Sequence, residues 1–460
     1  MHVEKMRAFT LFSYFCRQNR TPMKKLSLLV AAVLMLTLAS AQDTVKTYWK
    51  NNQLMSIGVQ VNKLEQGHWV FYHNNGVKWT EGEYKDGQKV GHWKVWFNDG
   101  KLSQEYEAQN GAFKSWYNSG QVESTGQMVN GKREGSWTFY HANGKLFKEV
   151  VYVQDSVNGP VTEYYDNGKK YFEGSYVMGE LDGYVCWWNK EGFKDMEGNT
   201  VKGLQEGNWK FYNENGELGS CGDFSKGLQE GEWKYYYENG KLWKKGSYVK
   251  GKREGLWTAW YEDGKQQRQG TFVNDMEDGE WTSYFETGRT KDHGYFKKGK
   301  MEGLWTGWYE DGHQKYAINY KNGMLNGHYT YYWEETKHMS KQGNYKDNLR
   351  TGVWCEYAQN GKILSKGKYV NDKKEGKWAF YNAFEKKIRE QNFVDDVPEG
   401  AFKEYYDNGK IHFQGAFKDR VRSGKWSCWT PDGKLYYSAI FVRGHKVKEV
   451  HVTNPKSSPF

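Results

Sequence analysis

Cysteine and aliphatic core residues are scarce in this chain of 460 residues. Only five residues are cysteine, and aromatic residues make up 17% of the chain out of a hydrophobic total of 37%. A central core of aliphatic side chains is therefore excluded, and burial has to come from flat rings stacked along a sheet. The 53 glycines also exclude a helical protein, because each would cost a helix about 1 kcal/mol relative to alanine.

Long hydrophobic runs are missing except for one near the N-terminus. Residues 26–38 form an apolar run of 13 residues, which is too short to span a bilayer as a helix. A basic start at Met23 precedes it and small residues ending at Ala41 follow it, as in an export signal. We therefore expect a signal peptide at 23–41 with cleavage after Ala41, a mis-assigned upstream extension at 1–22, and a periplasmic or secreted mature protein.

A strong excess of one charge is also absent from the mature chain. Residues 1–41 hold six Lys or Arg and one Glu, which leaves 60 basic and 55 acidic residues. Such a balance does not indicate nucleic acid as a partner.

What the chain does have is a glycine that recurs at a fixed interval. Sixteen times a glycine is followed two residues later by a large side chain and five residues later by an aromatic one. Thirteen of the fifteen gaps between these anchor glycines are 24 residues, one is 20 and one is 25. This period predicts an array of small supersecondary units. The anchors are Gly67, Gly91, Gly111, Gly135, Gly159, Gly183, Gly207, Gly231, Gly255, Gly279, Gly303, Gly327, Gly352, Gly376, Gly400 and Gly424.

One unit, residues 231–254, shows the pattern of a β-hairpin. Residues 233–237 are aromatic and short, as in a strand, and 242–249 read as the return strand. Asn239-Gly240 between them predicts a two-residue turn with both residues at positive φ. Residues 251–254 are polar and read as the connection to the next unit. We therefore predict an all-β fold: an elongated single-layer antiparallel β-meander of about sixteen 24-residue hairpin repeats.

The register within each hairpin stays open at this point. A two-residue turn would place Trp233 opposite Gly246, so that an indole could protect bare backbone. A one-residue bulge at the turn would change this pairing and exchange the two faces.

Aromatic residues form rows along the array, counted from each anchor glycine. Position +5 is aromatic in all sixteen units, and position +2 is aromatic in fourteen, with Val161 and Val185 as the exceptions. These rows are predicted as a structural ladder. Because a single-layer sheet has two faces, some rings should stay exposed as a candidate binding surface. The candidate residues are Trp69, Tyr72, Trp93, Trp96, Trp137, Tyr140, Trp209, Tyr212, Trp233, Tyr236, Trp257, Trp260, Trp281, Tyr284, Trp305, Trp308, Trp354, Tyr357, Trp378, Tyr381, Trp426 and Trp429.

No set of residues indicates catalysis, a cofactor or a metal. His68, His92 and His328 share one repeat position, read as a polar turn position, and no cysteine or carboxylate completes a zinc set with them. Acidic residues before the anchors, such as Glu254, recur in most units. We therefore expect them to bond turn amides or to pair with lysines such as Lys132 and Lys252, and not to act in catalysis. No phosphate-binding loop is present. We expect no enzyme and no cofactor.

The four cysteines beyond the signal are expected to be free thiols. Cys186 and Cys221 would lie about three strands, roughly 14 Å, apart, and Cys355 and Cys428 three repeats apart. A disulfide needs Cα atoms within about 7 Å.

The repeat unit resembles the MORN repeat in its bacterial variant. The residues that match the family pattern in order are Gly246, Tyr248, Gly251, Glu254, Gly255 and Trp260. The likeness extends from about Tyr48 to Lys446. It implies a long single-layer sheet used for contact with a protein or a membrane, and some bacterial relatives are described as antitoxin components.

The expected organisation is a partial capping repeat at 42–66, a repeat array at 67–447 and a C-terminal tail at 448–460. The leading hypothesis is an exported, non-enzymatic scaffold that binds a protein through a face or an edge of its sheet. The alternatives are binding to an anionic membrane surface, an antitoxin-like role, and a glycan-binding platform. Open end strands would also allow end-to-end self-association.

Overall fold

The computed structural model describes residues 43–453 and 459, and its regular elements are all strands. The strands are β1 Asp43–Tyr48, β2 Leu54–Val61, β3 Leu64–Tyr72, β4 Lys78–Lys85, β5 Gln88–Trp96, β6 Leu102–Glu107, β7 Asn110–Trp116, β8 Val122–Val129, β9 Lys132–Tyr140, β10 Leu146–Val153, β11 Ser156–Tyr164, β12 Lys170–Val177, β13 Glu180–Leu181, β14 Gly183–Trp188, β15 Lys194–Val201, β16 Leu204–Tyr212, β17 Leu218–Ser225, β18 Leu228–Tyr236, β19 Leu242–Val249, β20 Lys252–Trp260, β21 Gln266–Val273, β22 Met276–Tyr284, β23 Thr290–Lys297, β24 Lys300–Trp308, β25 Gln314–Lys321, β26 Met324–Tyr332, β27 Met339–Lys346, β28 Leu349–Tyr357, β29 Ile363–Val370, β30 Lys373–Tyr381, β31 Lys387–Val394, β32 Val397–Tyr405, β33 Ile411–Lys418, β34 Val421–Trp429, β35 Leu435–Val442 and β36 His445–Val452.

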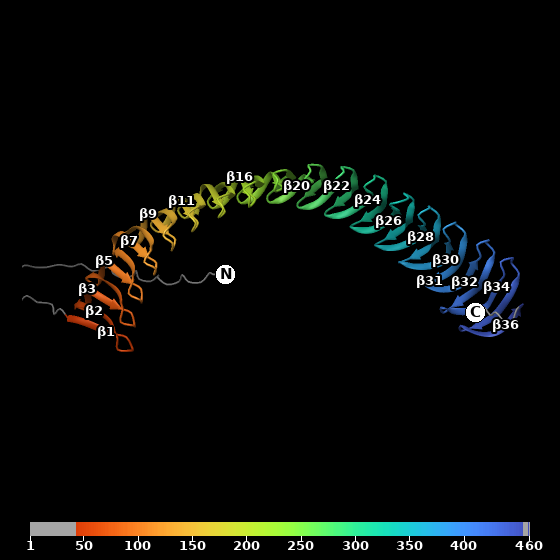
Figure 1. The fold of residues 1–460 in the computed structure, drawn as a ribbon, viewed down its shortest axis with the longest axis horizontal. Coiled ribbons are helices and arrows are strands. Elements are labelled where there is room, and N and C mark those ends of the chain that lie inside the picture. Colours follow the sequence, from red (N-terminus) through yellow and green to blue (C-terminus); the bar gives the residue numbers. More distant parts are fainter. Residues whose placement is uncertain (1–42, 454–458, 460) are drawn as a thin grey trace, which may run out of the picture.

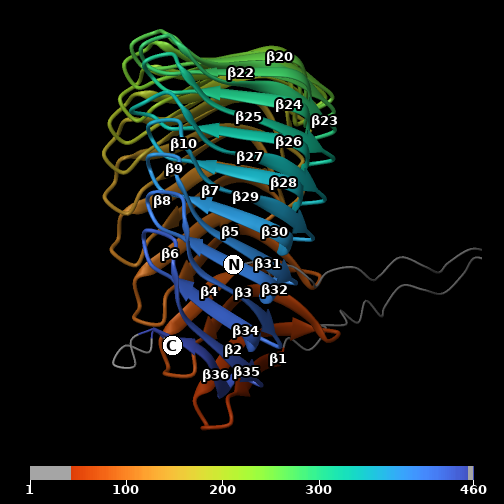
Figure 2. The same ribbon diagram turned by 90° about the vertical axis from the view of Figure 1, so that its right-hand side faces the viewer.

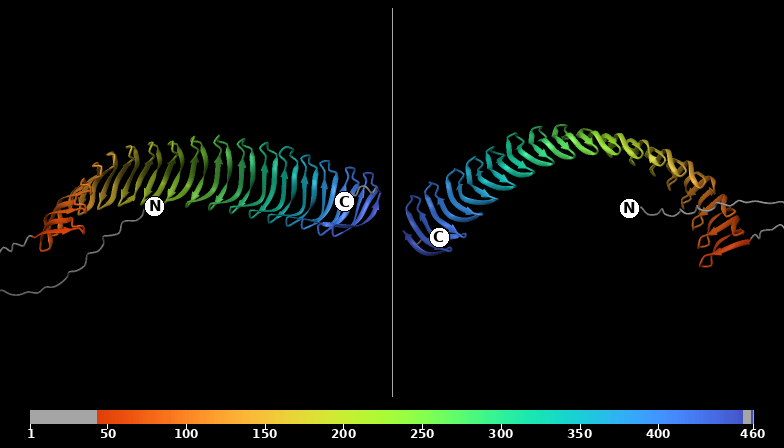
Figure 3. Two further views of the ribbon diagram at one scale, coloured as in Figure 1. Left: turned by 60° about the horizontal axis from the view of Figure 1, so that its bottom comes forward. Right: turned by 180° about the vertical axis from the view of Figure 1, so that it is seen from behind.

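These strands form one open antiparallel sheet of 36 strands, as the repeat predicts. Successive strands pair in chain order, as in β18–β19 and β19–β20. The short β13 and the following β14 both pair with β12. Figure 1 shows the result as a long arch with its ends far apart, and the views in Figure 3 show the strands running across it. Figure 2, seen from one end, shows the connections gathered along the two long edges of the arch. Beyond the sixteen predicted units, the sheet includes the hairpin β1–β2 at one end and β36 at the other.

The loop that holds Asn239-Gly240 has a different geometry from the predicted one. Gly240 has φ of +78°, whereas Asn239 is not at positive φ. The amide of Gly240 donates to the carbonyl of Tyr237 at 2.9 Å, and the amide of Tyr237 donates to the carbonyl of Lys241 at 2.8 Å. The prediction of a two-residue turn was therefore wrong, because the loop has three residues. It is the common three-residue hairpin loop, in which a type I turn is followed by a glycine in the left-handed region.

Asparagine is useful in this loop because it both accepts and donates hydrogen bonds. The side-chain oxygen of Asn143 accepts from the amide of Lys145 at 3.0 Å, and its Nδ2 donates to the carbonyl of Asp166 in the next repeat at 2.8 Å. The same bond to a carbonyl 23 residues on is made by Asn167 and Asn408. Each asparagine thus closes its own loop and ties it to the following one.

The two-residue turn lies at the opposite edge, where the sequence predicted a longer connection. Lys250 and Gly251 have φ of +50° and +77°, and Val249 pairs directly with Lys252. The connection predicted at 251–254 was therefore wrong, because β20 already begins at Lys252. A two-residue turn with both φ values positive matches the twist of the strands on either side, which explains its recurrence at this edge.

The anchor glycine is needed for its backbone conformation and not for space. Gly255 has φ of +70°, and a Cβ added there would meet no atom within 4 Å. Pairing between β19 and β20 shifts register between Lys245 and Ser247, opposite this glycine. The anchor therefore creates a bulge inside the strand, and a bulge redirects the side chains that follow it.

A second row of glycines is needed for space, because an indole lies flat on each. A Cβ added at Gly246 would overlap the ring atoms of Trp257, which comes from the following hairpin. Eleven tryptophans at position +2 lie in this way on a glycine eleven residues earlier. In ten of them the indole Nε1 also donates to the carbonyl of the residue after that glycine, at 2.9–3.2 Å.

The predicted pairing of Trp233 with Gly246 is confirmed, but the indole over that glycine is a different one. Trp233 lies opposite Gly246 in the register, and a bulge at Tyr235/Tyr236 absorbs the extra residue near the loop. The ring of Trp233 covers Gly222 in the preceding hairpin, and Trp257 covers Gly246. Each indole therefore joins two successive hairpins rather than the two strands of its own.

We predict that Gly246→Val destabilises the array by about 1–3 kcal/mol, because an overpacked side chain forces its neighbours off their rotamers. Trp257→Val should cost roughly 3 kcal/mol by leaving a cavity. The double variant should cost at least about 1 kcal/mol less than the two single changes added together, since residues in contact are coupled. Urea unfolding and amide exchange of β18–β21 would measure this, and strict additivity would contradict the contact.

Candidate binding surface

Alternation along the strands places the aromatic rows on two different faces. The indole face carries positions +2, +4 and +17. On it the ring centroid of Trp233 lies 6.0 Å from that of Tyr235 and 5.1 Å from that of Phe224. The eleven tryptophans at +2 are only 0–8% exposed. Half of the candidate residues are therefore buried in a row on the indole face.

The other half lie on the opposite face, which we call the mixed face and which carries positions +1, +3, +5, +14 and +18. All sixteen rings at +5 are half-buried, so that an edge of each reaches the surface along the whole arch. Near the two-residue turns, the same face exposes valine and leucine side chains, among them Val201, Leu204, Leu228 and Val249, each 46–50% exposed. Exposed apolar groups thus follow both borders of the mixed face.

Charged side chains occupy the middle of the mixed face, and Glu197 is one of the most enclosed of them, with its side chain 13% exposed. Its carboxylate accepts hydrogen bonds from the hydroxyls of Tyr184 and Tyr212, the latter at 2.5 Å, and from Lys194 Nζ at 2.6 Å. Burial by itself would raise the pKa of Glu197, but the bonds from Lys194 and the two tyrosines outweigh it and lower the pKa to about 2. Burial, together with the bond to Glu197, raises the pKa of Tyr212.

A matching cluster surrounds Glu390, 193 residues later in the array. Its carboxylate lies 2.7 Å from Lys387 Nζ and 3.0 Å from Lys377 Nζ, and it accepts from the hydroxyl of Tyr405 at 3.2 Å. Burial again opposes ionisation of Glu390, and the two lysines again lower its pKa to about 2. The tyrosines at +5 are therefore held in part by carboxylates of the preceding hairpin.

The acidic residues before the anchors bond turn amides, which is the first of the two roles predicted for them. Glu254 Oε2 accepts from the amide of Asn274 at 2.9 Å, and Glu230 Oε2 accepts from the amide of Lys250 at 2.9 Å. The same bond, to an amide 20 residues on, is made by Glu134, Asp182, Glu206, Asp278, Glu302, Glu375 and Glu399. These carboxylates are occupied in holding the next two-residue turn.

The histidines at +1 lie on strands and not, as read from the sequence, at a turn. His92 lies between Glu105 and Glu107, at 2.6 and 3.1 Å, on the mixed face. Across the described part of the chain, no group of three or more His, Cys, Asp or Glu residues is placed to hold a metal ion. Nor do those residues include a helix long and apolar enough to cross a membrane.

The four described cysteines are free, as predicted. Cys186 and Cys428 are buried, and burial raises the pKa of both thiols. They pack as small apolar groups.

Two sets of residues went unnoticed in the sequence. At position +6, a tyrosine such as Tyr237 donates from its hydroxyl to the carbonyl of Trp260 in the next unit at 2.7 Å, and His141 makes the same link at 2.8 Å. In a second set, Arg253 stacks 4.0 Å above the ring of Phe272 and bonds Asp275 at 3.1 Å. Both recur with the repeat, so their periodicity could have revealed them.

The fold and its rows of neighbour contacts define an open, single-layer repeat scaffold. Eleven segments match the family model described as "MORN repeat variant", and together they cover more than half of the chain. The chain therefore belongs to the MORN repeat variant family. The matched segments are residues 65–86, 89–110, 109–130, 133–154, 157–178, 205–221, 229–250, 253–274, 301–322, 350–371 and 398–419.

The remaining comparisons add little. No curated protein matches the chain. The crystal structure of TcdB2-TccC3-Cdc42 is 11% identical over 86% of this chain and 22% of its own, with a TM-score of 0.15. The Photorhabdus luminescens Tc holotoxin pore is 11% identical over 90% of this chain and 23% of its own, also with a TM-score of 0.15. This chain spans less than a quarter of those proteins, and at such TM-scores the likeness supports no argument about it.

The predicted upstream extension, signal peptide and cleavage after Ala41 lie outside the described residues. Residues 43–61 form the hairpin β1–β2 of the same sheet, and β36 ends at Val452, beyond residue 447.

We predict that Glu197→Gln destabilises the protein at neutral pH by roughly 1–3 kcal/mol, because hydrogen bonds to a buried charge are lost. Glu197 has a folded pKa of about 2, below its ordinary value of 4.5. Its contribution is therefore present in full above pH 4.5 and is lost as the pH falls toward 2. Urea unfolding of wild type and variant should converge near pH 2.

The matched control is Glu173→Gln, at the same repeat position. Glu173 also pairs with a lysine, at 2.7 Å, but its side chain is 47% exposed, so its loss should cost at most about 1 kcal/mol. Equal losses at the two sites, or a difference that does not change with pH, would contradict the account of Glu197.

Proposed function

We propose that the chain is an exported, non-enzymatic scaffold that binds a protein partner along its mixed face. The observation that supports this most is the unbroken row of sixteen half-buried rings at +5. Tyrosine and tryptophan edges that are partly exposed and held by neighbours supply contact area at little entropic cost, as in protein interfaces. The row follows the arch from end to end, so the partner is extended or repetitive.

The charges of the mixed face favour a protein over an anionic membrane. Carboxylates such as Glu197 and Glu390 lie between the aromatic row and the apolar border, each paired with lysines. A surface that binds anionic lipid gains from unpaired basic residues, whereas Lys194 and Lys387 on this face are paired with these carboxylates. Membrane binding, a glycan platform and an antitoxin-like role stay as alternatives, and the last rests on the family resemblance alone.

We predict that a variant carrying Tyr212→Ser, Tyr236→Ser and Tyr284→Ser loses a partner that the wild-type chain retains from an envelope extract. The three residues lie in four successive units of the +5 row, with Trp260 between Tyr236 and Tyr284, so one partner segment would cross all of them. The control is Phe384→Ser, which removes an aromatic side chain that is 81% exposed but lies in a loop at the edge. Retention by wild type and control and loss by the triple variant would support the proposal.

Two results would contradict it. One is that no protein is retained at mild salt, and the other is that all three chains retain the same proteins equally. Flotation with vesicles of anionic lipid and a glycan array, run on the same variants, would show whether the row serves one of the alternative ligands instead.

A further inference from the structure

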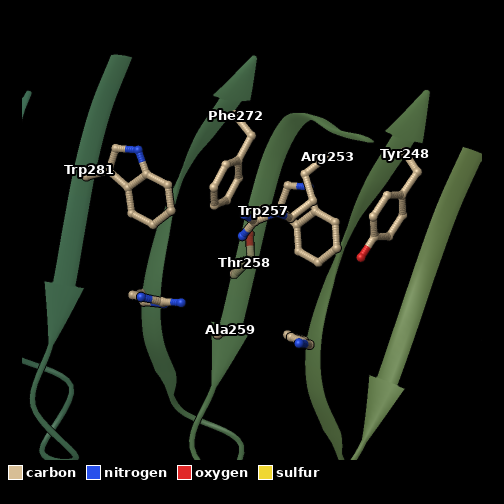
Figure 4. Close-up of a pocket in the computed structure, with 9 residues that line it drawn as sticks. Tyr248, Arg253, Trp257, Thr258, Ala259, Phe272 and Trp281 are labelled. Carbon is tan, nitrogen blue, oxygen red and sulfur yellow. The ribbon is translucent and has the colours of Figure 1, made fainter. Parts of the chain in front are cut away.

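A cavity of about 290 Å³ opens on the indole face between β19 and β22. Figure 4 shows the rings of Tyr248, Trp257, Phe272 and Trp281 side by side on successive strands, with Ala259 further along β20. Lys244, Arg253 and Arg268 complete the lining. The cavity thus combines aromatic walls with three cationic groups.

The cavity exists because a small residue occupies a position that is aromatic in the two preceding hairpins. Ala259 stands at +4, where Phe211 and Tyr235 stand in the two preceding units. In the register, Ala259 lies between Lys244 on one strand and Arg268 on the other. A methyl group between two long side chains leaves open the space that a ring fills elsewhere.

Beyond Ser283 in the next unit, a still smaller residue in this row leaves no such space. Gly307 also stands at +4, but the ring of Tyr316 covers it so closely that a Cβ would overlap the ring. The hydroxyl of Tyr316 donates to Asp292 at 2.5 Å. The array therefore fills the gap at Gly307 with its own side chain and leaves the one at Ala259 open.

Only one of the three cations around the cavity is paired with a carboxylate in the part of the chain that the structure describes. Arg253 is paired with Asp275 at 3.1 Å, but neither Lys244 nor Arg268 forms an ion pair with a carboxylate in the residues that the structure describes. Lys244 Nζ lies 4.5 Å above the ring of Tyr235. Burial, and then the nearness of Arg253 and Arg268, lowers the pKa of Lys244. An anion bound here would relieve this repulsion.

We propose that the cavity binds a carboxylate carried on a six-membered ring, either an aromatic acid or a uronic-acid sugar. Lys244 and Arg268 stand two strand spacings, about 10 Å, apart, which leaves room for a carboxylate that accepts from both. A cavity of roughly 150 Å³ holds a benzene molecule, so the observed 290 Å³ accommodates a ring together with its carboxylate. Because the site lies on the indole face, it is independent of the partner proposed for the mixed face.

The test titrates the full chain with sodium benzoate and sodium glucuronate, and with the neutral benzyl alcohol and glucose, by ligand-observed saturation-transfer NMR. We expect at least one of the two acids to bind and its neutral counterpart to bind at least about tenfold more weakly. The acid that binds identifies the source of the ring. Arg268→Gln should weaken binding at least about tenfold, the loss typical of a charge-assisted hydrogen bond, and Ala259→Phe should abolish it by filling the cavity.

Arg389→Gln is the matched control, because Arg389 occupies the same repeat position and stacks 4.2 Å above Phe380, which stands at +4 where the cavity unit has Ala259. It should bind as the wild type does. Failure of both acids to bind, binding of the neutral compounds equal to that of the acids, or equal weakening by Arg389→Gln and Arg268→Gln would each overturn the proposal. Circular dichroism checks that each variant folds. If Ala259→Phe does not fold, the comparison of the two arginine variants decides.

Discussion

The contact between an indole and the bare backbone of the preceding hairpin is the interaction on which the rest of the structure depends. A sheet one layer thick has no second layer to cover it, so each hairpin must be covered by its neighbours. The anchor glycine makes this possible: at positive φ it produces a bulge, and two residues later the tryptophan lies flat on a glycine of the previous unit. One glycine is selected by its conformation and the other by the absence of a Cβ. Together they convert a repeat in sequence into burial between repeats.

The rows of polar residues also join each unit to the next. The carboxylate before each anchor holds the next two-residue turn, the asparagine of each three-residue loop donates to the next loop, and the tyrosine at +6 bonds a carbonyl of the next unit. Each of these bonds joins residues 20 to 23 apart. Stability in such an array is a sum of terms within units and between nearest neighbours. The side chains on the two faces can then vary from unit to unit, and the open cavity at Ala259 is an example.

The period, the strands and the single layer could be predicted from the sequence because they are local or strictly repeated. The turns were harder to predict from the sequence. Asn239-Gly240 is typical of a two-residue turn, and only the hydrogen bond from the amide of Tyr237 to the carbonyl of Lys241 shows that the loop has a third residue. The glycine beneath each indole belongs to the preceding hairpin, whereas the predicted pairing joined the two strands of one hairpin. The sequence nevertheless contains a signal for the observed contact. Every tryptophan at +2 has a glycine eleven residues before it. Where +2 is Tyr329 or Val161 instead, the residue eleven positions earlier is Ile318 or Val150. The cavity could not be foreseen, since Gly307 is just as small and yet is covered.

The most direct measurement of the central claim is the proton chemical shift of the glycines, by NMR on a chain labelled only at glycine. A proton beneath the face of an indole is shielded by the ring current. Hα resonances of the eleven glycines that lie under tryptophans, Gly246 among them, should therefore be displaced far upfield, and those of anchors such as Gly255 should not. If both groups of glycines resonate in the ordinary range, the indoles do not lie on the backbone and the account of how successive hairpins hold together is wrong.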